Sequence, residues 1–294
     1  MVRAVFLLFL CSTSFLYAAP LRVGVSVLPM ESIVGAIGGE QVEVQSLQRE
    51  GDSCSVFEPR PSVVSWLAGA GLFLRIGAGY ESVIMEKLQS QFPDLRIRDL
   101  REAAAVLPLH GHNHDGHDHA DCGACSGHAG GETDPHLWLD PVRVAQMGGF
   151  IANELAGLRP GEAALFQQNQ KDLQERANAL DERLVRLLGP YRGRAFYIYH
   201  PALGYFAGRY GLRQVAISGA GQAPSVKELH RLVARAREDR VRTIFVQPQE
   251  SRKHAEIVAD AVGAEIVEID PMEPDWEKNI LQIGEALANS FVRE

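Results

Sequence analysis

The sequence lacks the short motifs that mark the commonest nucleotide-binding and hydrolytic sites. It contains no Gly-rich phosphate loop, no His-Glu-x-x-His pair and no Ser-centred nucleophile elbow. It also lacks an excess of positive charge, because 29 Lys and Arg stand against 37 Asp and Glu and the net charge is −8 at pH 7. Such a chain is poorly suited to nucleic acid and well suited to attracting cations. These absences favour a cation-binding role over nucleic-acid binding and over the commonest enzyme classes.

Long apolar runs are absent except at the N-terminus. Met1–Arg3 is a short basic start, and Ala4–Leu16 is a nearly unbroken apolar run with the length of a signal-peptide core. The run is too short to span a bilayer as a helix, and small residues follow it with a preferred cleavage point after Ala18. We expect residues 1–18 to be a signal peptide and the mature protein to be exported and soluble. An uncleaved N-terminal anchor is the alternative.

Cysteine is scarce, with four residues in a chain of 294. Removal of the signal peptide, which contains Cys11, leaves Cys54, Cys122 and Cys125. In an oxidising compartment Cys122 and Cys125 can form a disulfide or bind a metal, since they are spaced as Cys-x-x-Cys. Cys54 is then unpaired, and it is either a small buried apolar residue or a metal ligand.

Short β-rich runs alternate with helical patterns twice along the chain. The expected strands are 21–27, 42–47, 72–76 and 95–100 in the first half, and 195–199, 214–217, 243–246 and 265–269 in the second. Between the halves, 141–158 and 162–188 have helical periodicity. The pattern predicts an α/β fold of two lobes, each a mainly parallel β-sheet covered by helices, joined by a long rigid backbone helix. The expected boundaries are 19–140, 141–190 and 191–294.

One segment is far richer in metal-binding side chains than any packed core could use. Between Leu109 and Gly131 lie six of the ten histidines, two cysteines and three aspartates, interleaved with Gly and Ala. The histidines are His110, His112, His114, His117, His119 and His128. Imidazole, thiolate and carboxylate at this density match Zn²⁺ best, with Cu and Ni as competitors. We therefore interpret 110–128 as an auxiliary metal-binding loop.

Three further side chains stand where ligands bind in α/β proteins. His200 and Asp270 each directly follow an expected strand, and His136 lies in a proline-bracketed turn after the His-rich loop. Ligands in open α/β sheets bind beyond the carboxyl ends of strands, and a neighbouring proline restricts each of these backbones. Each residue alone has an ordinary structural explanation. Together, in a chain with a metal-binding loop, they predict a metal site between the lobes.

The same residues lie in blocks that resemble a known family, the cluster A-I solute-binding proteins of zinc and manganese ABC transporters (ZnuA/TroA type). The blocks are Phe57–Ser62, Asp134–Pro141, Tyr199–Phe206, Phe245–Gln249 and Ile269–Pro271. The resemblance implies two α/β lobes with the metal buried between them, and a His-rich loop is typical of its zinc-selective branch. It also implies that His136 and His200 are metal ligands and that Asp270 is the carboxylate ligand.

The chain departs from the family pattern at two places. The family usually has a Pro-His pair where Cys54-Ser55 stands, so its first metal histidine is absent here. Cys54 is the candidate replacement because thiolate suits Zn²⁺, and Ser55, Glu58 or water are the alternatives. Gln247 replaces the family's usual glutamate, which leaves less negative charge near the cleft.

The sequence as a whole predicts a monomeric, periplasmic zinc-binding receptor that delivers Zn(II) to an inner-membrane ABC permease. No catalytic residue is expected. A manganese or iron receptor of the same family is the nearest alternative, followed by an adhesin-like surface role. A zinc-dependent hydrolase is the alternative from another class, and it would need an open coordination position and a nearby general base.

Overall fold

The computed structural model describes residues 19–52, 57–107, 133–219 and 224–292. The expected signal peptide 1–18, Cys54, Ser55 and the His-rich loop 110–128, with Cys122 and Cys125, lie outside these ranges. Within them, no helix is both long enough and apolar enough to cross a membrane.

The N-terminal lobe is built on a four-stranded parallel sheet with the strand order β2-β1-β3-β4. Its strands are β1 (Leu21–Val25), β2 (Val42–Ser46), β3 (Leu72–Arg75) and β4 (Arg96–Asp99). Its helices are α1 (Pro29–Gly38), α2 (Pro61–Leu67) and α3 (Glu81–Gln91), followed by the 3-10 turn η2 (Leu100–Ala103). The central strands β1 and β3 are rich in Val, Leu and Phe because parallel sheets are covered on both faces.

The C-terminal lobe repeats this plan with the order β6-β5-β7-β8, again entirely parallel. Its strands are β5 (Ala195–Ile198), β6 (Arg213–Ala216), β7 (Thr243–Val246) and β8 (Glu265–Glu268). Its helices are α6 (Gly204–Tyr210), α7 (Val226–Glu238), α8 (Lys253–Val262) and α9 (Trp276–Val292). Both sheets place their first strand centrally, so their topologies match.

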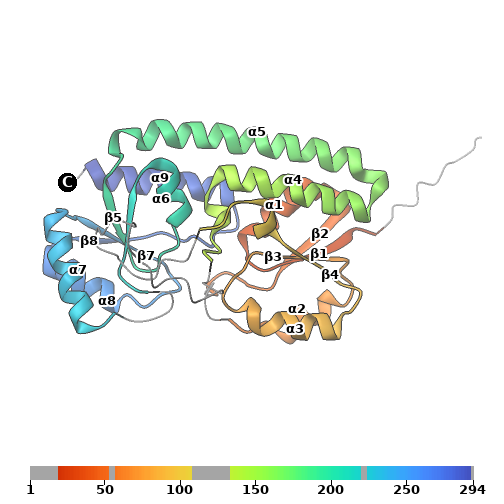
Figure 1. Cartoon of the computed structure of the whole chain (residues 1–294), viewed down its shortest axis with the longest axis horizontal. Helices are drawn as coiled ribbons and strands as arrows, with labels where there is room; N and C mark the ends of the chain where they lie inside the picture. Colours follow the sequence, from red (N-terminus) through yellow and green to blue (C-terminus); the bar gives the residue numbers. More distant parts are fainter. Residues whose placement is uncertain (1–18, 53–56, 108–132, 220–223, 293–294) are drawn as a thin grey trace, which may run out of the picture.

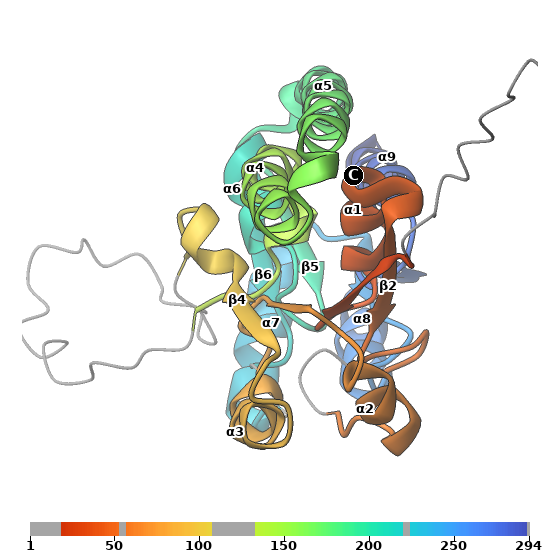
Figure 2. The same ribbon diagram turned by 90° about the vertical axis from the view of Figure 1, so that its right-hand side faces the viewer.

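Two helices join the lobes. The 3-10 turn η3 (Leu137–Leu139) leads into α4 (Pro141–Leu158), and α5 (Ala163–Leu188) then runs along one side of both lobes (Figure 1). The 26 residues of α5 correspond to a length of about 39 Å, and one face is buried against α1, α4 and α9. A Cβ at Gly284 would lie 2.3 Å from Leu184 Cδ2, so glycine is what allows α9 to approach α5. Figure 2 shows α5 stacked over α4.

One hydrophobic core continues through both lobes. It runs from the N-terminal sheet through α4, α5 and α6 to α9, and a second cluster fills the outer part of the C-terminal lobe. A continuous core makes α5 a structural strut rather than a flexible linker. The predicted fold class, with two parallel-sheet lobes and a long joining helix, is confirmed.

Candidate metal centre

A small cavity lies where residues Thr133–Asp140, here named the strap, meet the carboxyl end of the C-terminal sheet. Its volume is about 10 Å³, close to the space one ordered water or ion needs. The residues that line it are His136, His200, Ala202, Gln247, Gln249, Glu250, Pro271 and Met272. Most follow the ends of β5, β7 and β8, because the carboxyl ends of parallel strands share one edge of the sheet.

Both predicted histidines line this cavity and face one another. His136 is 1% exposed and His200 is 5% exposed, and their ring centroids are 5.4 Å apart. Two imidazoles on one tetrahedral Zn²⁺, with Zn–N near 2.0–2.1 Å, would have ring centroids roughly 5.2 Å apart. The observed centroid separation is therefore close to that of two imidazoles that share one ion.

Asp134 orients His136. Its Oδ1 lies 2.6 Å from His136 Nδ1 and accepts a hydrogen bond of 2.9 Å from the His136 backbone N–H. With Nδ1 facing a carboxylate, Nε2 is the imidazole nitrogen that can bind a metal, as in carboxylate–histidine–zinc arrangements. This role of Asp134 was not predicted from the sequence, although the Asp-Pro-His spacing places the carboxylate two residues before the imidazole.

Gln247 holds His200 through its backbone. The Gln247 amide accepts a hydrogen bond of 3.1 Å from the His200 N–H and donates one of 2.9 Å to the His200 carbonyl oxygen. A glutamate carboxylate can only accept, so it could not form both bonds. The glutamine that departs from the family pattern thus fixes the main chain that carries the second imidazole.

Asp270 lies beside the cavity but does not line it. Its Oδ1 accepts hydrogen bonds of 2.9 Å from Gln249 Nε2 and 2.8 Å from the Met272 N–H, and its carbonyl oxygen accepts one of 2.8 Å from Asn279 Nδ2. Its successors Pro271 and Met272 form part of the wall. The carboxylate is therefore held at the edge of the site.

The described residues bring together two of the predicted ligands and not a complete set. Across them, no three His, Cys, Asp or Glu side chains form a group that could hold a metal ion. Glu58 is exposed. Cys54, Ser55 and the loop histidines His110, His112, His114, His117, His119 and His128 lie outside the described residues.

The strap is anchored to the C-terminal lobe by two aromatic side chains. Tyr205 donates its hydroxyl to the Asp134 carbonyl oxygen at 2.7 Å and accepts a hydrogen bond of 3.0 Å from the Leu107 N–H. Burial raises the pKa of Tyr205 to about 12, so the hydroxyl keeps the proton that it donates. The indole N–H of Trp138 donates to the Pro271 carbonyl oxygen at 2.8 Å, which ties the strap to the segment after β8.

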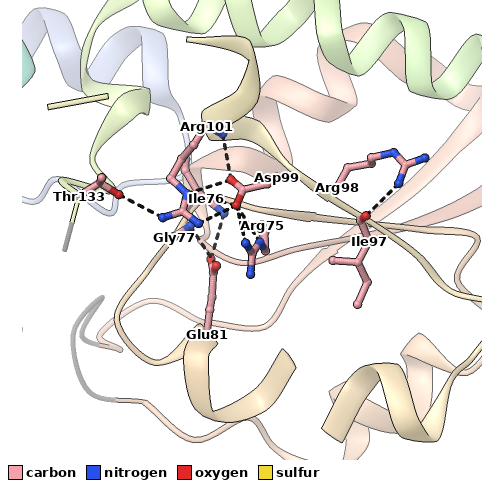
Figure 3. Close-up of polar contacts among 9 residues, drawn as sticks. All are labelled: Arg75, Ile76, Gly77, Glu81, Ile97, Arg98, Asp99, Arg101 and Thr133. Atoms are coloured by element: carbon pink, nitrogen blue, oxygen red, sulfur yellow. Dashed lines mark hydrogen bonds and ion pairs between the residues drawn. The ribbon is translucent and has the colours of Figure 1, made fainter. Parts of the chain in front are cut away.

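A charged network anchors the strap to the N-terminal lobe (Figure 3). Arg101 binds the Asp99 carboxylate through Nε and Nη2 and donates from Nη1 to the Thr133 hydroxyl at 3.0 Å. Burial acts to raise the pKa of Asp99, but hydrogen bonds from Arg101 and Arg75 outweigh it and hold that pKa below its usual value. The residues that lead to His136 are thus fixed from both lobes.

Two parallel-sheet lobes, a connecting helix and a small imidazole-lined cavity beside the strap define a solute-binding protein. More particularly, the family model described as "Zinc-uptake complex component A periplasmic" matches residues 23–292, and the chain belongs to that family. The description of the family makes its members components of a zinc-uptake complex. The resemblance predicted from the sequence is therefore confirmed.

Individual relatives agree with this assignment. The chain is similar to the high-affinity zinc uptake system protein ZnuA of Yersinia pestis, with 25% identity over 84% of this chain and 81% of that protein. It is 26% identical to the zinc-binding lipoprotein AdcA of Streptococcus pneumoniae over 92% of this chain, and it spans 53% of that relative. A crystal structure of ZnuA matches with a TM-score of 0.82 and 30% identity, covering 92% of this chain and 99% of that one.

Proposed function

We propose that this protein is a periplasmic receptor that captures one Zn²⁺ between its lobes and delivers it to an inner-membrane ABC permease. The observation that carries the proposal is the pair His136 and His200, which are buried, converge on one cavity and have a ring separation suited to a tetrahedral ion. Family membership and the zinc-uptake names of the relatives support the same function.

The proposed ligands are His136, His200 and Asp270. Two imidazole nitrogens favour Zn²⁺ over Mn²⁺, which prefers oxygen donors, so we place the manganese or iron receptor second. Asp270 would reach the ion from the edge of the cavity by turning its carboxylate, since its backbone is held by Asn279. The sequence offers Cys54 as a fourth ligand, with Ser55, Glu58 or water as alternatives.

The composition of residues 110–128, rich in histidine and glycine, suits a separate and weaker metal-binding role. Side chains that must be ordered when they bind an ion pay an entropic cost that a preformed pair does not. We propose that this loop collects ions that the preformed site then holds. The receptor acts as a monomer, and its acidic net charge of −8 suits a cation rather than nucleic acid as ligand.

The test is the His200→Ala variant, measured by competition with a calibrated zinc chelator. We expect at least a roughly 100-fold loss of affinity for the tight ion, which corresponds to about 2.7 kcal/mol. His230→Ala is the matched control because His230 is an exposed histidine on α7, outside the cavity. Near-parental affinity in His200→Ala would refute the assignment of the site.

A further inference from the structure

Glu250 is the third side chain in the cavity wall with metal-binding chemistry. Of the eight lining residues, His136 and His200 offer imidazoles and Glu250 offers a carboxylate, whereas the others offer amides, a thioether or no donor. Tetrahedral Zn²⁺ takes four donors, so the two imidazoles leave two positions to fill. Asp270, which is outside the wall, can fill one of them.

The main chain at Glu250 is fixed to that of His200. The Glu250 N–H donates a hydrogen bond of 3.1 Å to the Gln247 carbonyl oxygen, and Gln247 in turn forms its two hydrogen bonds to the His200 backbone. Glu250 is therefore attached to the segment that positions a proposed ligand. Its side chain has three torsions, so its carboxylate can turn without movement of the backbone.

A second carboxylate ligand would suit the charge of the ion. Gln247 and Gln249 are neutral, so without Glu250 the described residues offer Asp270 as the direct carboxylate ligand, while the Asp134 carboxylate acts through His136. Buried charge is costly unless it is paired, and direct coordination pairs it most closely.

We infer that the Glu250 carboxylate coordinates the captured ion beside His136 and His200, at the position that the absent first histidine of the family leaves open. The inference rests on the function proposed above and deepens it. No three potential ligands are grouped in the described residues, so Glu250 joins the ion by side-chain rotation when zinc binds. Cys54, the candidate from the sequence, is then left out of the coordination shell.

The experiment compares the parent with Glu250→Gln, Glu250→His and Glu256→Gln. The glutamine variant keeps the size of the side chain but loses the carboxylate, and the histidine variant supplies another good zinc ligand. Glu256→Gln is the control because Glu256 is an exposed carboxylate on α8. Zinc affinity is measured by chelator competition, and the coordination shell by the visible absorption of one equivalent of Co²⁺.

We expect Glu250→Gln to weaken zinc affinity at least about tenfold and to change the Co²⁺ spectrum. The zinc affinities of Glu250→His and Glu256→Gln should stay within about threefold of the parent. Parental affinity and spectrum in Glu250→Gln would overturn the inference, and zinc-dependent protection of Cys54 from alkylation would then identify Cys54 as the ligand. Equal losses in both Glu250 variants with an unchanged spectrum would also overturn it. A parent without a tight zinc site would instead refute the proposed function itself.

Discussion

Asp134→Asn tests whether the carboxylate that orients His136 determines zinc affinity. In the parent, Oδ1 of Asp134 lies 2.6 Å from Nδ1 of the imidazole and 2.9 Å from the His136 N–H. Asparagine keeps the shape and one acceptor oxygen but removes the charge. Hydrogen bonds to charged groups contribute about 1.5–3 kcal/mol against about 1 kcal/mol for neutral ones.

The difference predicts a loss of about 0.5–2 kcal/mol in zinc binding, or roughly 2- to 30-fold in affinity. The upper part of this range overlaps the roughly 10- to 100-fold effects typical of such carboxylate–histidine partners. Oδ2 lies against Gly204, where a Cβ would come within 2.7 Å of it, so a glycine is what leaves room for this carboxylate. The assay is chelator competition at pH 7, with urea unfolding of the zinc-free protein measured in parallel.

Asp181→Asn is the matched control for this prediction. Asp181 is also buried, but it binds Arg209 and Tyr210 between α5 and α6 and does not line the cavity. We expect it to lower the free energy of unfolding without changing zinc affinity. If Asp134→Asn binds zinc as tightly as the parent, the orienting role of Asp134 is wrong.

Three other outcomes are expected. Tyr205→Phe should weaken zinc affinity several-fold because the strap loses its hydrogen bond to the Tyr205 hydroxyl. Tyr210→Phe should leave zinc affinity unchanged, because its hydroxyl binds Asp181. Equal affinities of the two variants in chelator competition would contradict this prediction. Deletion of residues 110–128 should remove the weakly bound zinc ions seen in equilibrium dialysis and leave one tightly bound ion. Loss of the tightly bound ion would refute the proposal that residues 110–128 and the tight site are separate. Burial raises the pKa of Glu31 above its ordinary 4.5, although a hydrogen bond from the Ser46 N–H acts to lower it. The folded state therefore favours the protonated carboxyl, and the free energy of unfolding falls as pH rises through the pKa of the folded state. Glu31→Gln should therefore be more stable than the parent in urea at pH 7, and a lower stability would count against this account.

Helices were more predictable than the ends of strands. The predicted range 141–158 agrees with α4, and the predicted range 162–188 agrees with α5 to within one residue at its start. Predicted strands ran too far at their carboxyl ends, as at Val27, Ile76 and Ile269. These residues are buried, so they look like strand residues in the sequence, but they lie beyond the paired part of each strand. Apolarity reports burial, whereas strand assignment also requires a hydrogen-bonded neighbour.

The candidate site was predictable only in part, for a related reason. His136 and His200 could be predicted because each histidine lies next to a proline, and His200 also follows an expected strand, which can be seen in the sequence itself. The hydrogen bond from Tyr205 to Asp134 joins residues 71 positions apart, and no local pattern contains it. Glu250 was missed because a carboxylate in a turn is ordinary until the fold places it in the same wall as two imidazoles.

The contacts that fix the strap also position His136 for zinc binding. The strap is bound to the C-terminal lobe through Tyr205 and Trp138 and to the N-terminal lobe through Arg101, while one core runs through both lobes. These contacts hold His136 beside His200 in the structure. A preformed imidazole pair does not pay the cost of ordering side chains on binding, so zinc affinity at the proposed site should depend on the strap anchors as well as on the ligands. Substitutions at the anchors should consequently weaken the tight ion while leaving binding by residues 110–128 unchanged.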